Sequence, residues 1–244
     1  MTTALQIKDF TITAAEIIPL LDNYRLLPQF LREVIIDRAI VNIEYTAAEF
    51  NHVYQEFTQQ YQLNSAAKLE AWLNKMNITK TQLKTRMIRN IKLDKFKQEQ
   101  WGHQLESYFL ERKLAFEKAI FSLIRVKSAG MAIELYHRLQ EGENSFAELA
   151  KLYSLGEEAN KNGLVGLVKL IDLHHVLAQM LHRSTPGQLL PPRQIEDHWV
   201  IVRLEQYFPA RLDRAMRERL LNELCDRWLE KQLATIDSSK IQAV

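Results

Sequence analysis

The chain has 244 residues, of which 47% are hydrophobic and 25% charged, and its formal net charge at pH 7 is +2. This composition excludes a disordered or collagen-like chain, and the balanced charge lacks the strongly basic footprint of a dedicated nucleic-acid-binding protein. The single cysteine, Cys225, excludes an internal disulfide and a metal cluster built from several thiols, so we expect no metal and no cofactor.

The beginning of the chain carries no targeting signal that we can identify. The first ten residues lack a basic region followed by a long apolar run, and no later segment has 18 uncharged apolar residues. The pattern therefore predicts no signal peptide and no membrane span, and with them a cytoplasmic location.

The first 101 residues contain no glycine and only two prolines, Pro19 and Pro28. A run of this kind, rich in Leu, Ile, Gln, Glu, Lys and Ala, predicts an almost wholly helical segment. Capping-box pairs indicate three helix starts: Thr13 with Glu16, Thr46 with Glu49, and Thr79 with Gln82. Apolar residues three and four apart follow these caps, so we expect about five amphipathic helices packed into a bundle.

One helix of this bundle is strongly basic. Residues 80–97 carry seven lysines and arginines, which we interpret as a solvated helix face, with phosphate or an acidic partner as the alternative. Aromatic residues at helical spacing, Tyr54, Phe57, Tyr61 and Trp72, fit the bundle core or, alternatively, a groove for unfolded chain.

The middle of the chain changes its pattern. Residues 119–126 read as a strand, two short helices follow near 129–140 and 146–153, and glycines then mark a loop. A short apolar segment, a helix near 173–183 and a clear strand at 199–204 complete the order β-α-α-(β)-α-β-β. We therefore expect an α+β sheet domain over residues 116–208, inserted between a helical domain (1–115) and a C-terminal helical segment (209–244).

Four motifs in this middle domain resemble the parvulins, a class of peptidyl-prolyl cis-trans isomerase (PpiC-like). Residues 145–154, SFAELAKLYS, are similar to the family's F-A-E-L-A-K-x-Y-S helix, and residues 159–166, ANKNGLVG, resemble its A-N-x-G-G-D-L-G turn. Residues 185–189, TPGQL, resemble the K-P-G-E-I turn, and residues 199–204 match the last strand. The helical flanks, including residues 105–116, resemble the SurA/PrsA-type chaperone-isomerases. This resemblance implies that the helix of residues 209–244 packs on the N-terminal helices.

The resemblance implies a site with a polar part and an apolar part. In parvulins the polar part is two histidines, one on the first and one on the last strand, with a Cys or Asp nearby. Carried over, these polar positions, together with the Asp of the glycine turn, are occupied by Ser122, Gly156, Leu164 and Val200. The family's apolar positions still carry apolar residues, since Leu173 and Leu177 occupy them. Met180 and Trp199 lie nearby.

The missing polar groups leave several functions open. Glu157 and His198 are possible substitutes, as are His174, His175 and His182, although solvated or helix-packed histidines are the simpler interpretation. We expect a parvulin-family chaperone that binds proline-containing or unfolded polypeptide, with catalysis weak or lost. The alternatives are an active isomerase with a rearranged site and a non-catalytic adaptor that docks one folded partner.

Overall fold

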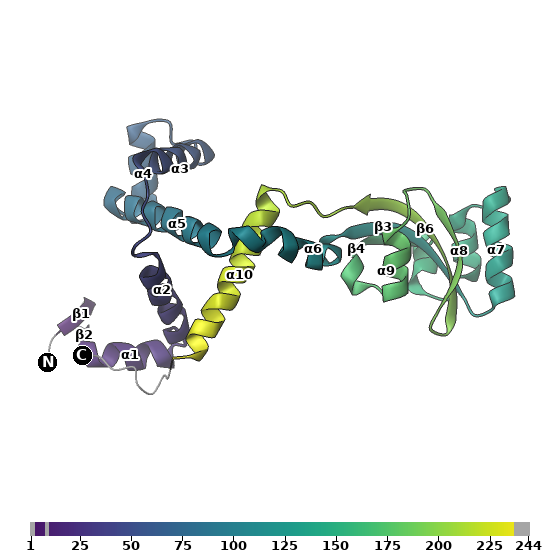
Figure 1. The fold of residues 1–244 in the computed structure, drawn as a ribbon, viewed down its shortest axis with the longest axis horizontal. Helices are drawn as coiled ribbons and strands as arrows, with labels where there is room; N and C mark the ends of the chain where they lie inside the picture. The colour runs from purple at the N-terminus through teal and green to yellow at the C-terminus, as the bar shows by residue number, and fades with distance from the viewer. Residues whose placement is uncertain (1–2, 8–9, 237–244) are drawn as a thin grey trace. The chain divides into compact units, whose positions relative to one another are not determined.

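The computed structural model describes residues 3–7 and 10–236, which fall into two compact units. The helical unit comprises the described residues up to Leu105 and from Arg214 onward, and the sheet unit comprises Glu106–Asp213. These limits lie ten and five residues from the domain limits expected at 115 and 208. Each unit is described by itself below (Figure 1).

The helical unit is built from helices whose starts the sequence marks clearly. The predicted capping boxes form at Thr13, Thr46 and Thr79, and Pro28 lies in the first turn of its helix. None of the described helices combines the length and the apolar character that crossing a lipid bilayer requires. The helices are α1 (Ala14–Asn23), α2 (Leu27–Ile40), α3 (Ala47–Gln60), α4 (Ala66–Lys75), α5 (Lys80–Trp101) and α10 (Arg214–Ala234), and a short 3₁₀ turn, η1, spans Gly102–Gln104.

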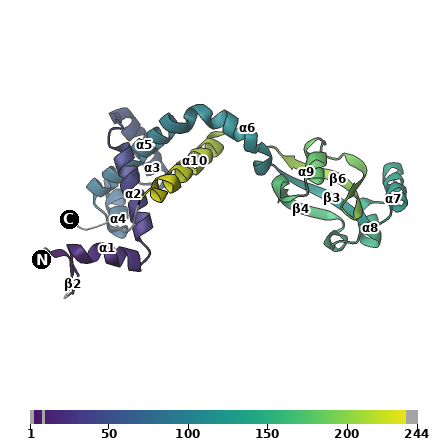
Figure 2. The same cartoon turned by 60° about the horizontal axis from the view of Figure 1, so that its bottom comes forward.

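Two apolar clusters hold the helical unit together. One joins α3, α4 and α5 around Leu73, Leu83 and Met87, and Phe57 and Trp72 pack against it, as expected for a bundle core. The other joins α2, α5 and α10 around Phe96 and Leu229. The C-terminal helix therefore packs on helices from the N-terminal part of the chain (Figure 2), so the sheet unit is an insertion within the helical one.

The basic side chains of α5 are mostly engaged within the unit rather than free in solvent. Arg89 bridges Glu33 and Asp37 of α2, with N–O distances of 2.6 Å to each. Lys95 pairs with Glu49 of α3 at 2.9 Å. The interpretation of residues 80–97 as a solvated face is therefore only partly right, because these cations link α5 to α2 and α3.

The expectation of an almost wholly helical N-terminal segment is wrong at its start. Two strands, β1 (Thr3–Ile7) and β2 (Phe10–Thr13), pair antiparallel before α1 begins. The physical reason lies in the threonines and isoleucines of this stretch, which favour extended backbone; the absence of glycine and proline does not by itself favour helix over strand.

The sheet unit has the predicted α+β topology. Its sheet has the order β4-β3-β6-β5 with every neighbouring pair antiparallel. One face packs on α7 and α8, and the other packs on α9 (Figure 1). The elements are α6 (Leu105–Phe116), β3 (Lys118–Val126), α7 (Ala129–Glu141), α8 (Phe146–Tyr153), β4 (Leu164–Lys169), α9 (His175–His182), β5 (Leu189–Ile195) and β6 (His198–Phe208), with short 3₁₀ turns η2 (Glu157–Lys161) and η3 (Leu170–Asp172).

Truncating the buried face of α10 tests whether this helix is part of the helical core. Leu229 is 2% exposed, so we expect Leu229→Ala to lower the free energy of unfolding by about 2–5 kcal/mol through lost burial and a residual cavity. Urea unfolding followed by tryptophan fluorescence measures this, because Trp72, Trp101 and Trp228 all belong to the helical unit. The exposed neighbour Glu230 provides the control variant Glu230→Ala, and equal stability of the two variants would contradict the packing.

Candidate functional site

The pairing of β3 with β6 sorts the expected site residues onto two faces of the sheet. In this register Ser122 lies opposite Arg203, and Arg125 lies opposite Val200. Directly opposed residues of antiparallel strands share a face, and successive residues alternate between faces. Ser122 therefore faces α7 and α8, whereas Val200 faces α9. The expectation that both belong to one site is wrong, and the β3 residue on the Val200 face next to Ser122 is Leu123.

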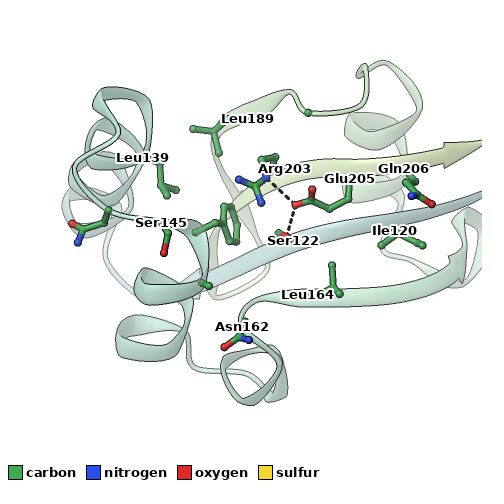
Figure 3. A pocket seen from close by; sticks show the side chains of 14 residues that line it. Ile120, Ser122, Leu139, Ser145, Asn162, Leu164, Leu189, Arg203, Glu205 and Gln206 are labelled. Carbon is green, nitrogen blue, oxygen red and sulfur yellow. Dashed lines mark hydrogen bonds and ion pairs between the residues drawn. The ribbon is translucent and has the colours of Figure 1, made fainter.

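The hollow on the first face, here called the α8 hollow, has a volume of about 820 Å³ (Figure 3). Ser122 is 4% exposed, and its hydroxyl donates a hydrogen bond to Glu205 Oε1 at 2.6 Å. Arg203 Nε donates to the same oxygen at 2.8 Å, and its guanidinium lies 5.2 Å from the centre of the Phe146 ring. Leu164, another expected site position, also lines this hollow. The hydroxyl of Ser122 is thus committed to a structural network.

The hollow on the other face, here called the α9 hollow, brings several of the predicted residues together. Its volume is about 180 Å³. Leu123 of β3, Leu177 of α9 and Val200 of β6 are buried and form its apolar floor. Polar side chains also line it, namely Arg125, His174, Glu196 and His198. Two of the histidines considered as substitutes therefore lie beside Leu177, at an expected apolar position of the site, and Val200, at an expected polar position.

The remaining apolar candidates are distributed around this hollow or lie away from it. Leu173 and Met180 pack against the same apolar cluster as Leu177, but each lines a different hollow beside α9. Trp199 packs against the cluster on the α7 and α8 face, because it is one residue from Val200 in the strand. Its assignment to the peptide-binding group with Leu177 is therefore wrong.

An ion pair between the buried Glu158 and the partly exposed Arg125 lies beside Gly156, where the resemblance implies a Cys or Asp. Glu158 is 4% exposed and receives two hydrogen bonds from Arg125, at 2.9 and 2.6 Å, and a third from Ser154 at 2.7 Å. A Cβ added to Gly156 would lie 2.2 Å from Glu158 Oε2 and 2.3 Å from an Arg125 nitrogen, so a side chain there would displace the ends of these two side chains. Glu157, the acidic candidate, is exposed beside this pair and does not line the α9 hollow.

The electrostatics of the pair follow from its burial and its hydrogen bonds. Burial alone would raise the pKa of the Glu158 carboxyl, but the hydrogen bonds from Arg125 and Ser154 outweigh burial and hold this pKa below its ordinary value of 4.5. The same hydrogen bonds raise the pKa of Arg125. The sequence offered one signal for this pair, a single arginine inside the otherwise apolar end of β3.

A second buried carboxyl anchors the other end of α9. Glu117 is 1% exposed and accepts a hydrogen bond from the Tyr207 hydroxyl at 2.5 Å, while His182 Nδ1 lies 2.9 Å from the same oxygen. The same ring nitrogen lies 2.8 Å from the Tyr207 hydroxyl, so the three side chains form one cluster. Burial and the neighbouring Glu117 raise the pKa of Tyr207 well above its ordinary value. His182 and His175 line another hollow, so neither supplies an imidazole to the α9 hollow.

Replacing Glu158 by glutamine tests the role of the ion pair through its pH dependence. The pKa of Glu158 is lowered by folding, so its contribution to stability is present above pH 4.5 and is lost as the pH falls through the folded pKa. At pH 7 we expect Glu158→Gln to lower the free energy of unfolding by about 1–3 kcal/mol. The difference from the unmodified protein should narrow below pH 4.5.

Urea unfolding at several pH values measures both effects. Glu157→Gln is the matched control, since it makes the same chemical change at the exposed neighbour. A stability difference for Glu158→Gln that stays constant between pH 7 and pH 3 would show that the carboxylate form is not what the fold stabilises.

Comparisons with known proteins give one family match and several similar solved structures. The family model for the rotamase, PPIC-type PPIASE domain, matches residues 114–206. A search of curated proteins found no match. Among solved structures, the chain is similar to the peptidylprolyl isomerase PrsA from Bacillus anthracis, with 18% identity, coverage of 84% of this chain and 89% of that chain, and a TM-score of 0.42.

Two further solved structures are also similar to this chain. The first is a structure of the SurA-like chaperones PEB4 and Cj1289 of Campylobacter jejuni, with 13% identity, 96% of this chain and 94% of that chain covered, and a TM-score of 0.40. The second is the parvulin domain of PpiD from E. coli, with 24% identity, 40% and 95% covered, and a TM-score of 0.35. The family match covers residues 114–206, and this part of the chain is therefore similar to the PPIC-type peptidyl-prolyl isomerase domain.

Proposed function

We propose that the protein binds extended, proline-containing segments of unfolded polypeptide in the α9 hollow, and that its isomerase activity is weak. The observation that carries this proposal is the apolar floor formed by Leu123, Leu177 and Val200. A proline ring is apolar and lacks the amide hydrogen that would need a partner, so it can occupy such a floor without leaving a buried donor unsatisfied.

The same floor explains why we expect slow turnover. Rotation about an X–Pro bond has a barrier of about 18–20 kcal/mol, and an enzyme lowers it only by binding the twisted amide better than the planar forms. Leu123 and Val200 offer no hydrogen bond to the carbonyl or nitrogen of that amide. Arg125 has donors, but its contacts to Glu158 occupy two of its nitrogens.

A second candidate function is an active isomerase with a rearranged site. It is favoured by one specific observation, that His174 and His198 both line the α9 hollow. His174 precedes α9 and His198 begins β6, so the two imidazoles approach the hollow from different elements. Imidazoles placed around the twisted amide could donate to its oxygen or nitrogen and thereby restore catalysis.

We propose an unfolded chain rather than one folded protein as the client. Exposed apolar side chains at the start of the helical unit support this, since Tyr24, Leu26 and Phe30 are 66%, 44% and 50% exposed. Apolar groups of this kind can contact many different unfolded sequences. The cytoplasmic location predicted from the sequence stays a prediction, and cell fractionation tests it.

Paired peptides that differ only at one residue test the binding proposal. We expect a short alanine-based peptide with a central proline to bind at least fivefold more tightly, by about 1 kcal/mol, than the same peptide with alanine there. Leu177→Ala should abolish this preference by opening the floor, with circular dichroism confirming that the variant is folded. Equal binding of the two peptides to the unmodified protein contradicts the proposal. Failure to bind either peptide or an unfolded client also contradicts it and is the result expected of an adaptor.

An isomerisation assay on the same proline peptide separates the two candidate functions. Weak catalysis means a rate enhancement far below the ~100-fold that one positioned acid–base group contributes. A larger enhancement that disappears in the double variant His174→Ala/His198→Ala establishes the second candidate instead. His137→Ala, an exposed histidine on α7 at the opposite face of the sheet, is the matched control.

A further inference from the structure

We propose that the polypeptide bound in the α9 hollow is recognised further by an acidic residue close to its proline, which Arg183 and Arg193 bind in a neighbouring hollow. This inference rests on the proposed function and specifies its client. The neighbouring hollow, here called the arginine hollow, lies between α9 and β5 and has a volume of about 350 Å³.

The arginine hollow is distinguished by two cations without a counter-charge. Arg183 follows the last turn of α9, Arg193 belongs to β5, and both are exposed. Within residues 3–7 and 10–236, no carboxylate forms an ion pair with either guanidinium. A guanidinium binds a carboxylate through two parallel hydrogen bonds, so a pair of such groups facing one hollow is complementary to an acidic side chain.

The two hollows lie along the same two elements, α9 and β5. Leu177 and Ile195 line the α9 hollow, and on the same helix and strand Met180 and Arg193 line the arginine hollow. From Leu177 to Arg183 the helix rises about 9 Å, and from Ile195 to Arg193 the strand extends about 7 Å. Two or three residues of an extended chain cover these distances. The acidic residue should therefore lie two or three positions from the proline.

Charge also decides which of the two hollows takes the acidic side chain. Glu196 lines the α9 hollow and would repel a second carboxylate, and the one arginine of that hollow, Arg125, is already paired with Glu158. The arginine hollow holds Arg183 and Arg193 and is lined by no acidic residue. An acidic client residue is therefore directed away from the proline-binding floor and toward the arginines.

The prolines of β5 favour recognition of the client through side chains over recognition by backbone pairing. This strand is at the edge of the sheet, where an unpaired strand could accept a peptide by backbone pairing. Pro191 and Pro192 lack amide hydrogens, and because the amides of successive strand residues point to opposite sides, one of the two prolines removes a donor from that edge. The client is consequently held at this edge by side-chain contacts, in which the arginines provide the specific element.

A set of matched peptides tests the inference. The parent is the alanine-based peptide with a central proline, and single glutamates are placed two or three residues before or after the proline, each with a glutamine control. At low ionic strength we expect at least one glutamate position to tighten binding about three- to tenfold over its glutamine control, and added salt to reduce this gain. Arg183→Gln/Arg193→Gln should abolish the gain but leave binding of the parent peptide unchanged.

The control and the contradicting outcomes separate this inference from the proposed function. Lys151→Gln removes one exposed positive charge on α8, at the other face of the sheet, and should keep the gain. If the parent binds but no glutamate position surpasses its glutamine control, the inference is overturned and the proposed function stands. If no peptide binds, both are overturned. Displacement of the acidic peptide by a single-stranded oligonucleotide at lower concentration would assign the arginines to nucleic acid and also overturn it.

Discussion

The pairing of β3 with β6 at the centre of the sheet determines what each face of the sheet unit can do. A slip of one residue in this pair would exchange every side chain between the two faces. In the observed register, Leu123, Val200 and Val202 pack beneath α9, whereas Ile124 and Ile201 pack beneath α7 and α8. The α9 hollow, with its apolar floor and polar lining, is a direct consequence of this register.

Helix α9 packs on this face of the sheet, and two buried carboxylates, Glu158 and Glu117, stabilise the sheet unit around it. Glu158 fixes the turn after α8 to Arg125, which also lines the α9 hollow. Glu117 receives hydrogen bonds from Tyr207 of β6 and His182 at the end of α9. Both carboxyls are satisfied by hydrogen bonds, as buried charges must be. The helix that lines both the α9 hollow and the arginine hollow is thereby held against the sheet.

Much of the fold could be predicted from local signals in the sequence. Capping pairs such as Thr46 with Glu49 mark helix starts because the interaction is completed within four residues. The topology of the sheet unit followed from a strand, helix and turn order that few arrangements satisfy. The first two strands were missed because residues 3–13 carry no turn signal of glycine or proline, although their threonines and isoleucines favour strands.

The site was predicted less completely, for a physical reason. β3 is buried on both faces, so Phe121, Ser122, Leu123 and Ile124 show no alternation of polar and apolar residues that would reveal which of them faces α9. The motif alignment consequently placed the first-strand position at Ser122, which faces away from Val200. The contact of Arg125 with Glu158 joins residues 33 positions apart and leaves no local pattern, and the same holds for the approach of His174 and His198 to one hollow.

Methyl NMR of protein labelled at leucine and valine tests most directly that the face beneath α9 is the binding face. Titration with the proline peptide should shift the methyl signals of Leu177 and Val200, which line the α9 hollow, and leave those of Leu139 and Leu164, which line the α8 hollow, unchanged. Shifts confined to Leu139 and Leu164 would place the polypeptide on the opposite face and contradict the account.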